Sequence, residues 1–222
     1  MPKFFVTQDK ISDNQIIIDS EDVTHISRVL RLEKGDNVTV CDGQGTDYDA
    51  QIDTIEPKKI LLNIVSRQKS ETEPNIKVTL FQALPKASKM EYIIQKTTEL
   101  GISEIVPVKL SRCVVKIDNK KDEKKKIDRW QKIAESAAKQ SGRGIVPTVS
   151  EFMTVNEVIE KSKEFDLFFV PYECEEQKTL KEILTSKSDV KSVGFVIGPE
   201  GGFDLSETEK TSFKRYRYSN AR

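Results

Sequence analysis

The amino-acid sequence predicts an α/β protein: a small N-terminal β-barrel, then a mostly parallel sheet with helices on both faces. Two observations predict this class. Residues 1 to about 70 alternate short apolar stretches with turn-forming residues, and from residue 76 strand-like and helix-like stretches alternate. The rhythm changes at a polar, proline-terminated stretch. The sequence therefore predicts one domain at 1–73 and a second at 74–222.

The first domain is predicted from four strands and the turns between them. The strands are expected at residues 15–18, 37–40, 48–52 and 60–65. Gly35-Asp36 and Asp42-Gly43-Gln44-Gly45 separate them, and such close spacing is typical of a small β-barrel. A short helix at 21–30 is expected to interrupt the strands, and residues 67–74 are expected to form a linker.

The second domain is predicted from the alternation of strands and helices. Strands are expected at 76–84, 105–110, 167–170 and 193–197, and helices at 88–100, 127–140 and 180–184, with one more that opens at Ser206 and Glu209. In the helix at 88–100, Ser88 and Glu91 match a capping box, and Gly101 follows as the C′ residue. Its expected apolar face consists of Met90, Ile93, Ile94 and Thr97.

Charge is balanced in total but unevenly distributed. The chain of 222 residues has 36 basic and 36 acidic side chains. Residues 1–73 carry nine basic against fourteen acidic side chains, whereas 74–145 carry sixteen against eight. A basic middle of this kind is able to hold phosphates. A solvated helix face explains 120–126 well but explains Lys86, Lys89, Arg112 and Arg143 poorly.

Composition excludes several classes of protein. Three isolated cysteines and a single histidine leave no plausible zinc set, and Cys113 with His25 would form a nucleophile pair only by chance. No apolar stretch is long enough to span a membrane, and the N-terminus lacks a signal-peptide core. The sequence therefore predicts a cytoplasmic, reduced protein that does not bind membranes.

The segment 194–202 reads Gly-Phe-Val-Ile-Gly-Pro-Glu-Gly-Gly, a buried strand that ends abruptly. Its glycines allow a close backbone approach or a positive φ, so the loop could direct N–H groups at a ligand. Glu200 could accept a hydrogen bond from a hydroxyl or an amine. The alternative is a plain tight turn before a helix. Because ligands of open parallel sheets bind beyond the carboxyl ends of the strands, this loop and Pro171-Tyr172-Glu173 are the candidate site.

Several motifs, in the right order, make the chain resemble the RsmE family of 16S rRNA (uracil-N3)-methyltransferases in the SPOUT superfamily. They are His25-Ile26-Ser27-Arg28-Val29-Leu30-Arg31, the stretch Lys-Met-Glu-Tyr-Ile-Ile-Gln-Lys-Thr-Thr-Glu-Leu-Gly at 89–101, Ser111-Arg112-Cys113, Arg129-Trp130-Gln131-Lys132-Ile133, Gln140-Ser141-Gly142-Arg143 and 197–202. No single motif is specific, but together they cover most of the chain.

The resemblance implies a PUA-like RNA-binding barrel followed by a homodimeric SPOUT domain with a trefoil knot, an exception to the rule that chains are unknotted. S-adenosylmethionine would be bound in the knot, and the methyl acceptor would be uridine N3 in the 16S rRNA of the small ribosomal subunit. The implied cofactor-binding residues are Pro171, Tyr172, Glu173, Ile197, Gly198, Pro199, Glu200, Gly201 and Gly202.

Methyl transfer from a sulfonium is an in-line displacement, so alignment supplies much of the rate. Uridine N3 carries a proton at neutral pH, so a base, or a cation that stabilises the uridinate, should help. Arg112 suits the second role, although a phosphate contact explains it equally well. Glu99 or Glu135 could be the base, although both fall in predicted helices, where a solvated carboxylate is the more ordinary explanation.

Further basic side chains are candidate RNA contacts, to phosphates or to bases. They are Arg28, Arg31, Lys86, Lys89, Lys96, Arg112 and Arg143. His25 is expected to pack or to hydrogen-bond locally rather than to catalyse.

The chain departs from the family after Lys214. Family members continue through an apolar strand, a Leu-Gly-containing loop and a last helix, whereas this chain ends in a basic, aromatic tail at 215–222. Removing one adenine from a plausible codon run at Lys214 restores Asp-Ile-Gly-Ile-Val-Thr-Leu-Gly, which favours a frameshift. We therefore expect a truncated knot segment and an irregular tail. Residues 193–197 would then lack main-chain partners, and catalysis would be impaired.

Two other functions compete with the methyltransferase. A non-catalytic RNA-binding module would keep the barrel and the basic surface without a working cofactor site. A dehydrogenase-like α/β enzyme is disfavoured because no Gly-x-Gly-x-x-Gly motif opens a helix here.

Overall fold

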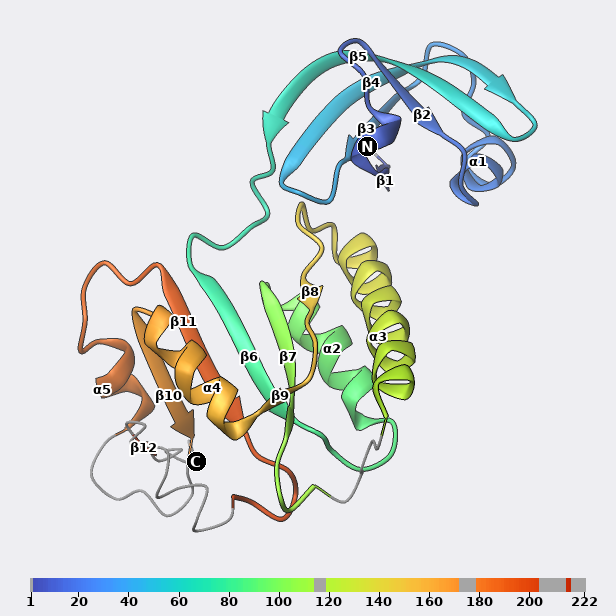
Figure 1. Cartoon of the computed structure of the whole chain (residues 1–222). Helices are drawn as coiled ribbons and strands as arrows, with labels where there is room; N and C mark the ends of the chain where they lie inside the picture. Colours follow the sequence, from blue (N-terminus) through green and yellow to red (C-terminus); the bar gives the residue numbers. More distant parts are fainter. Residues whose placement is uncertain (1, 114–118, 172–178, 204–214, 217–222) are drawn as a thin grey trace. The chain divides into compact units, whose positions relative to one another are not determined.

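The computed structural model describes residues 2–113, 119–171, 179–203 and 215–216, the last two by their backbone alone (Figure 1). The chain divides into two compact units. Unit 1 comprises Met1–Glu73 and Ala138–Val146, and unit 2 comprises Pro74–Ala137 and Pro147–Arg222. The sequence-based division at residue 73 did not predict that residues 138–146, which come later in the chain, belong to unit 1.

Unit 1 is built on a five-stranded sheet in the order β1-β3-β4-β5-β2. The strands are β1 (Lys3–Phe5), β2 (Gln15–Ile18), β3 (Asn37–Cys41), β4 (Thr46–Glu56) and β5 (Lys59–Lys69). Only β1 and β3 pair in parallel. The four predicted strands are confirmed, although β1 was missed and β4 and β5 are longer than expected. In the strand pairing described, β1 and β2 lie at the two ends of the sheet order.

The predicted linker at 67–74 is wrong in its first part, because β5 continues to Lys69. Residues Ser66–Lys69 pair with the start of β4, with Arg67 opposite Tyr48. The Arg67 guanidinium lies 5.8 Å from the centre of the Tyr48 ring. This cation–π contact and the strand pairing extend order into a stretch whose polar composition had suggested a linker.

The predicted helix at 21–30 is confirmed in two short pieces, α1 (Asp22–Thr24) and a π-helix, η2 (His25–Val29). A further 3₁₀ turn, η1 (Gln8–Lys10), precedes β2. Val23 and Ile26 point into the core of unit 1, where they join the inward-facing residues of the strands, among them Ile16, Val38 and Leu62. Burial of alternate strand residues holds the register of this sheet.

Unit 2 contains a parallel sheet in the order β12-β10-β11-β6-β7-β8, with β9 also paired to β7. Its strands are β6 (Lys77–Ala83), β7 (Glu104–Lys109), β8 (Thr148–Val149), β9 (Met153–Thr154), β10 (Leu167–Pro171), β11 (Ser192–Ile197) and β12 (Arg215–Tyr216). Every pairing among them is parallel. The predicted parallel sheet is confirmed. The strands of two residues were not predicted, since two residues carry no periodicity.

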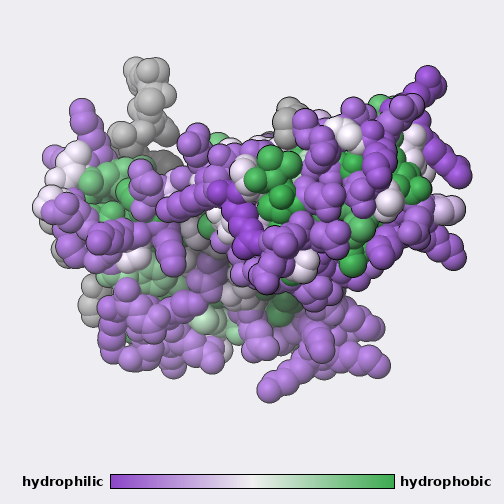
Figure 2. All heavy atoms as spheres, turned by 90° about the horizontal axis from the view of Figure 1, so that it is seen from above, coloured by the Kyte–Doolittle hydropathy of each residue, from purple (hydrophilic) through white to green (hydrophobic). Residues whose placement is uncertain are grey.

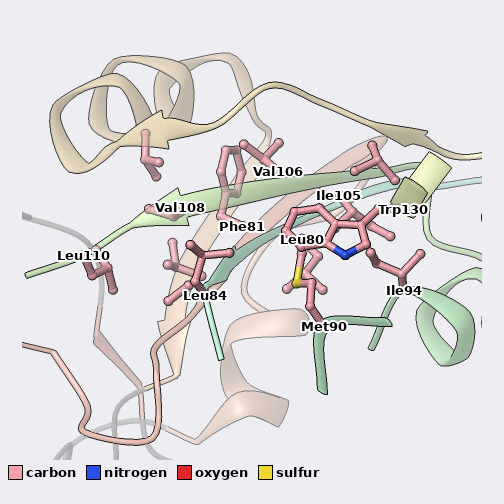
Figure 3. Packing of buried hydrophobic residues seen from close by; sticks show 14 of the residues in the cluster. Leu80, Phe81, Leu84, Met90, Ile94, Ile105, Val106, Val108, Leu110 and Trp130 are labelled. Carbon is pink, nitrogen blue, oxygen red and sulfur yellow. The ribbon is translucent and has the colours of Figure 1, made fainter. Parts of the chain in front are cut away.

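Helices cover both faces of this sheet. They are α2 (Lys89–Glu99), α3 (Lys120–Ser141), α4 (Val155–Lys161) with the 3₁₀ turn η3 (Ser162–Glu164), and α5 (Leu180–Leu184). Figure 3 shows Met90, Ile94 and Trp130 gathered beside Leu80. On the other face, the Phe81 ring lies 5.8 Å from that of Phe165, which follows η3. Ile183 of α5 packs in a smaller cluster with Leu167, Phe169 and Val193.

The capping box predicted for α2 does not form. Ser88 makes no side-chain cap, and the Glu91 carboxylate instead pairs with Arg129 at 2.7 Å. The fully inward positions are Met90, Ile94 and Thr98, so Thr98 replaces the predicted Thr97. The Thr97 hydroxyl donates to the Ile93 carbonyl at 2.8 Å, a back-bond that keeps this polar side chain on the helix.

Glycine is required at two positions of unit 2. Gly101 has φ +99°, as predicted for a C′ residue, and a Cβ there would lie 2.7 Å from the Pro74 ring. At Gly194 a Cβ would lie 2.6 Å from the Phe168 ring. The glycine of β11 therefore makes room for an aromatic side chain of the neighbouring strand.

The predicted loss of main-chain partners at 193–197 is wrong. Strand β11 lies between β6 and β10 and pairs with both. Residues Arg215–Tyr216 pair instead with the end of β10, at Val170 and Pro171. The helix predicted from Ser206, the candidate residues Tyr172 and Glu173, and residues 217–222 lie outside the described part of the chain.

The surface drawn in Figure 2 is mostly hydrophilic and is interrupted by small hydrophobic patches. Charged residues make up 32% of the chain, which accounts for this appearance. In the described part of the chain, no helix combines the length and the apolar character that crossing a membrane requires.

Candidate functional site

Three loops of unit 2 meet at the carboxyl edge of its sheet. They follow β6 (84–88), β7 (110–113) and β11 (198–203), which are consecutive parallel neighbours in the order β11-β6-β7. The ends of parallel neighbours lie at one edge, so the loops after them come together. Pro171 ends β10 at the same edge and is half-buried.

The loop at 198–202 (the glycine loop) is a tight turn. The Gly202 N–H donates to the Pro199 carbonyl at 2.9 Å, and Gly202 has φ +68°, which favours glycine. Gly201 is different. Its φ is not positive, and a Cβ would meet nothing closer than the Arg112 Cβ at 3.8 Å. Among the described residues, the fold does not require glycine at 201, because a Cβ there would make only ordinary van der Waals contacts with Arg112.

Glu200 is held by the loop that follows β6. Its carboxylate accepts the Lys89 ammonium at 2.8 Å and the Lys86 N–H at 3.2 and 3.4 Å to its two oxygens. The hydrogen bond from Lys89, with help from backbone N–H groups, lowers the pKa of Glu200 to about 2. The sequence suggested that Glu200 would accept a ligand's hydrogen bond. In the structure the donors come from the chain itself.

Arg112 binds Gly201, the residue of the glycine loop that follows Glu200. Its guanidinium donates to the Gly201 carbonyl at 3.1 Å, from the loop that follows β7. Lys86, Lys89 and Arg112 were all predicted as RNA contacts, and all three touch the predicted cofactor loop. The structure therefore brings two predicted sets of residues into one place. No local sequence pattern distinguishes a charged side chain that binds a backbone loop from one that binds RNA, so these contacts could not be predicted.

Glu99 and Lys96 are not part of this cluster. The Glu99 carboxylate accepts the Lys96 ammonium at 2.8 Å, one turn earlier in α2. Lys89 begins this helix and Glu99 ends it, a rise of about 15 Å at 1.5 Å per residue. Within the chain, the candidate base therefore lies at the opposite end of α2 from the glycine loop. Glu135, the other candidate base, is exposed on α3.

Arg28 and Arg31 lie on an exposed part of unit 1, at and just after η2. Two apolar side chains between them, Val29 and Leu30, are 64% and 38% exposed. Arg31 has φ +53°, a left-handed conformation that few arginines adopt. His25 makes an edge contact with Phe4 at 6.3 Å between ring centres, as the expectation of local packing implied.

Arg143 is buried rather than presented to solvent. It pairs with Glu73 at 2.5 Å, and the two side chains are only 5% and 11% exposed. Glu73 also accepts the N–H groups of Gly144 and Ile145 at 2.8 and 2.9 Å. Burial opposes ionisation of Glu73, but Arg143 and these N–H groups outweigh it and lower its pKa. A side chain this buried and already paired with Glu73 does not fit the predicted RNA contact at Arg143, whether to a phosphate or to a base.

Glu73 was missed by sequence reasoning because it lies in the stretch interpreted as a linker. Nothing local distinguishes it, since its partners come 70 to 72 residues later in the chain. Among the residues that the structure describes, no group of three or more His, Cys, Asp or Glu side chains could hold a metal ion.

Comparison with known protein families matches both parts of the chain. Residues 72–219 match an RNA methyltransferase domain, and residues 18–65 match an RNA methyltransferase PUA domain. The two parts of the chain are thus an RNA methyltransferase domain and the PUA domain that accompanies it.

Individual relatives show to which family of RNA methyltransferases the chain belongs. The chain is 34% identical to ribosomal RNA small subunit methyltransferase E of Bacillus subtilis over 95% of its length and 84% of the relative's. It is 29% identical to the protein of that name from Mesomycoplasma hyopneumoniae, covering 96% and 89%. A crystal structure of the Neisseria gonorrhoeae enzyme bound to S-adenosyl methionine matches with a TM-score of 0.82, at 27% identity, covering 99% and 89%. The chain belongs to the ribosomal RNA small subunit methyltransferase E family.

Proposed function

We propose that this chain transfers a methyl group from S-adenosylmethionine to N3 of a uridine in small-subunit ribosomal RNA. Unit 2 would hold the cofactor at the carboxyl edge of its sheet, and unit 1 would bind RNA. The observation that carries this proposal is the glycine loop after β11, held by the loops after β6 and β7. Membership of the family supports a methyl transfer to ribosomal RNA, and the glycine loop supports the proposed position of the cofactor in the chain.

The residues at this edge fit the cofactor. Gly201 leaves space that a side chain would fill, although nothing in the chain demands a glycine there. Ile197 ends β11, Gly198 and Pro199 begin the glycine loop, and Pro171 lies on the neighbouring strand β10. When bound, S-adenosylmethionine supplies an electrophilic methyl group on a sulfonium. The chain's part is to position the two reactants and to shield them from water.

Arg112 is the candidate catalytic residue closest to the glycine loop. It is exposed, and one of its nitrogens donates to the Gly201 carbonyl. A guanidinium beside the acceptor could stabilise negative charge on a uridine that loses its N3 proton, while Arg112 also holds the loop. Glu99 would act as a base only if another part of the assembly brought substrate to the far end of α2.

RNA recognition is proposed for cations of both units. Arg28 and Arg31 would contact phosphates through unit 1, and Lys86, Lys89 and Lys96 would do so along α2 and the loop before it. The exposed Val29 and Leu30 between the two arginines could pack against an unpaired base.

We also propose that the chain acts as a homodimer in the cytoplasm, where small ribosomal subunits are assembled. Tyr92 of α2 and Leu100, which follows the end of that helix, are 64% and 84% exposed, unusual values for large apolar side chains. Light scattering behind size-exclusion chromatography would measure the mass, and a single 25.3 kDa species at assay concentration would contradict the dimer.

Methyl transfer from labelled cofactor to small subunits that lack the modification tests the activity. Nuclease digestion and mass spectrometry should then find 3-methyluridine in the small-subunit RNA. RNA binding without any transfer would favour the non-catalytic RNA-binding module instead. Methylation of another base or atom would keep the class of enzyme and change the acceptor.

A further inference from the structure

Glu200 is a strongly ionised carboxylate at the edge of the candidate cofactor site. A free carboxylate there could bind a hydroxyl or an amine of the ligand. In the structure both of its oxygens are already engaged by the loop after β6. Its partners Lys86 and Lys89 frame the start of α2, where the helix dipole also favours an anion.

We propose that Glu200 is a positioning residue: its carboxylate fixes the glycine loop by binding the Lys89 ammonium and the Lys86 N–H, and it contacts neither cofactor nor nucleotide. The assignment deepens the proposed function and, for its cofactor measurements, rests on it.

The geometry defines a clamp at two successive residues of the loop. Glu200 is bound through its side chain to Lys86 in the loop after β6 and to Lys89 at the start of α2. Gly201 is bound through its carbonyl to Arg112 in the loop after β7. The strands β11, β6 and β7 are adjacent, so the clamp ties the glycine loop across two neighbours. The loop itself contributes one backbone hydrogen bond, from Gly202 to Pro199. Among the described residues, the side-chain contacts that hold Glu200 and Gly201 come from Lys89 and Arg112, together with the Lys86 N–H.

The low pKa of Glu200 fits this role. Its partners stabilise the charged form, so the carboxylate keeps its charge at every pH at which the protein would be assayed. Ala87, which separates Lys86 from Ser88, has φ +54°. This unusual left-handed residue turns the chain just after the Lys86 N–H that binds Glu200.

The clamp can be tested without cofactor. Hydrogen–deuterium exchange of the peptide spanning 195–203 should be at least about tenfold faster in Glu200→Ala than in the unaltered chain, because the loop opens more often. Glu160→Gln is the matched control, since it breaks an exposed ion pair between Glu160 of α4 and Lys163 of η3, remote in sequence from the loop. Its 195–203 peptide should exchange as in the unaltered chain. Equal exchange in Glu200→Ala would overturn the clamp.

A double-mutant cycle on cofactor affinity separates positioning from direct contact. Glu200→Ala and Lys89→Ala should each weaken S-adenosylmethionine binding by roughly tenfold, and the double variant by little more, since both remove one interaction. Glu200→Gln should lose less, because it keeps an oxygen for the Lys86 N–H. Effects that multiply to about a hundredfold would mean that Glu200 contacts the ligand itself, contrary to the proposal.

The two experiments also distinguish a failure of the clamp from a failure of the proposed function. An unaltered chain that does not bind S-adenosylmethionine contradicts the proposed function, and the exchange measurement still decides on the clamp. An unaltered chain that binds normally, with neither Glu200→Ala nor Lys89→Ala weakening it, contradicts the clamp alone.

Discussion

Glu73 in unit 1 and Glu200 in unit 2 make the same kind of contacts in different surroundings. Each accepts backbone N–H groups and one cationic side chain. The side chains of the Glu73–Arg143 pair are 11% and 5% exposed, whereas those of the Glu200–Lys89 pair are 34% and 63% exposed. Burial decides what such a pair does: the first holds a fold together, and the second holds a loop at a solvent-accessible edge.

The largest expected difference lies in stability. Arg143→Ala leaves the Glu73 carboxylate buried without its cation, and this should lower the free energy of unfolding by about 3–5 kcal/mol. Lys89→Ala should leave the thermal midpoint almost unchanged, because exposed pairs contribute little. Denaturant unfolding of both variants measures the contrast. Arg143→Lys keeps the charge but not the planar guanidinium, so its free energy of unfolding should lie between those of the other two variants. Equal stability of all three variants would contradict the different roles assigned to the buried and the exposed pair.

Two glycines next to these pairs sharpen the comparison. At Gly144 a Cβ would lie 2.1 Å from the Ser70 Oγ, so Gly144→Ala should destabilise by about 1–3 kcal/mol. Gly201→Ala should leave stability within about 0.5 kcal/mol. It should nevertheless weaken S-adenosylmethionine binding by roughly tenfold, or about 1.4 kcal/mol. Calorimetry measures the cofactor affinity, and thermal unfolding measures the stability. Normal cofactor affinity in Gly201→Ala would indicate that the glycine loop is a plain turn without a role in cofactor binding.

Acid should weaken the buried Glu73–Arg143 pair. The pKa of Glu73 is lower in the folded chain than its ordinary value of 4.5, so its contribution to stability is fully present above pH 4.5. It is lost as the pH falls through the folded-state pKa. The unaltered chain should therefore lose stability more steeply below pH 4.5 than Glu73→Gln, which starts lower. Parallel curves of stability against pH for the two proteins would show that the pKa of Glu73 is the same in the folded and the unfolded chain.

The arginines of unit 1 provide the smallest expected effect. Arg28 and Arg31 are exposed, unlike Arg143, so Arg28→Ala with Arg31→Ala should leave folding intact. Binding to small-subunit RNA should weaken, and the slope of log affinity against log salt should flatten by about one unit for each phosphate that is no longer neutralised. Filter binding at several salt concentrations measures it. An unchanged slope would exclude these two arginines from the RNA interface.

The sequence predicted the features that local patterns encode. Apolar runs located β6, β7, β10 and β11, and their alternation with helices predicted the parallel sheet. The glycine loop was recognised by its composition. Strand β1 and the two-residue strands were missed because they are too short to show a period.

What the sequence could not predict is which partner each charged residue takes. Glu91 matched a capping box, yet it pairs with Arg129, 38 residues later, because the packing of α2 brings them together. Arg143 and Lys89 are both basic residues in a basic stretch, and only the fold buries one and exposes the other. Long-range pairing of this kind depends on tertiary packing and leaves no local trace.

The permanent charge of Glu200 has a consequence for the kinetics of the reaction. With a pKa of about 2, its carboxylate does not change protonation anywhere in the neutral or alkaline range. The clamp on the glycine loop should therefore be silent in a pH–rate profile. If the transfer rate rises with pH, the rise will report the loss of the uridine N3 proton or the state of the group that removes it. The pH–rate profile of this chain would then report the ionisation of the acceptor and its base, without a contribution from Glu200.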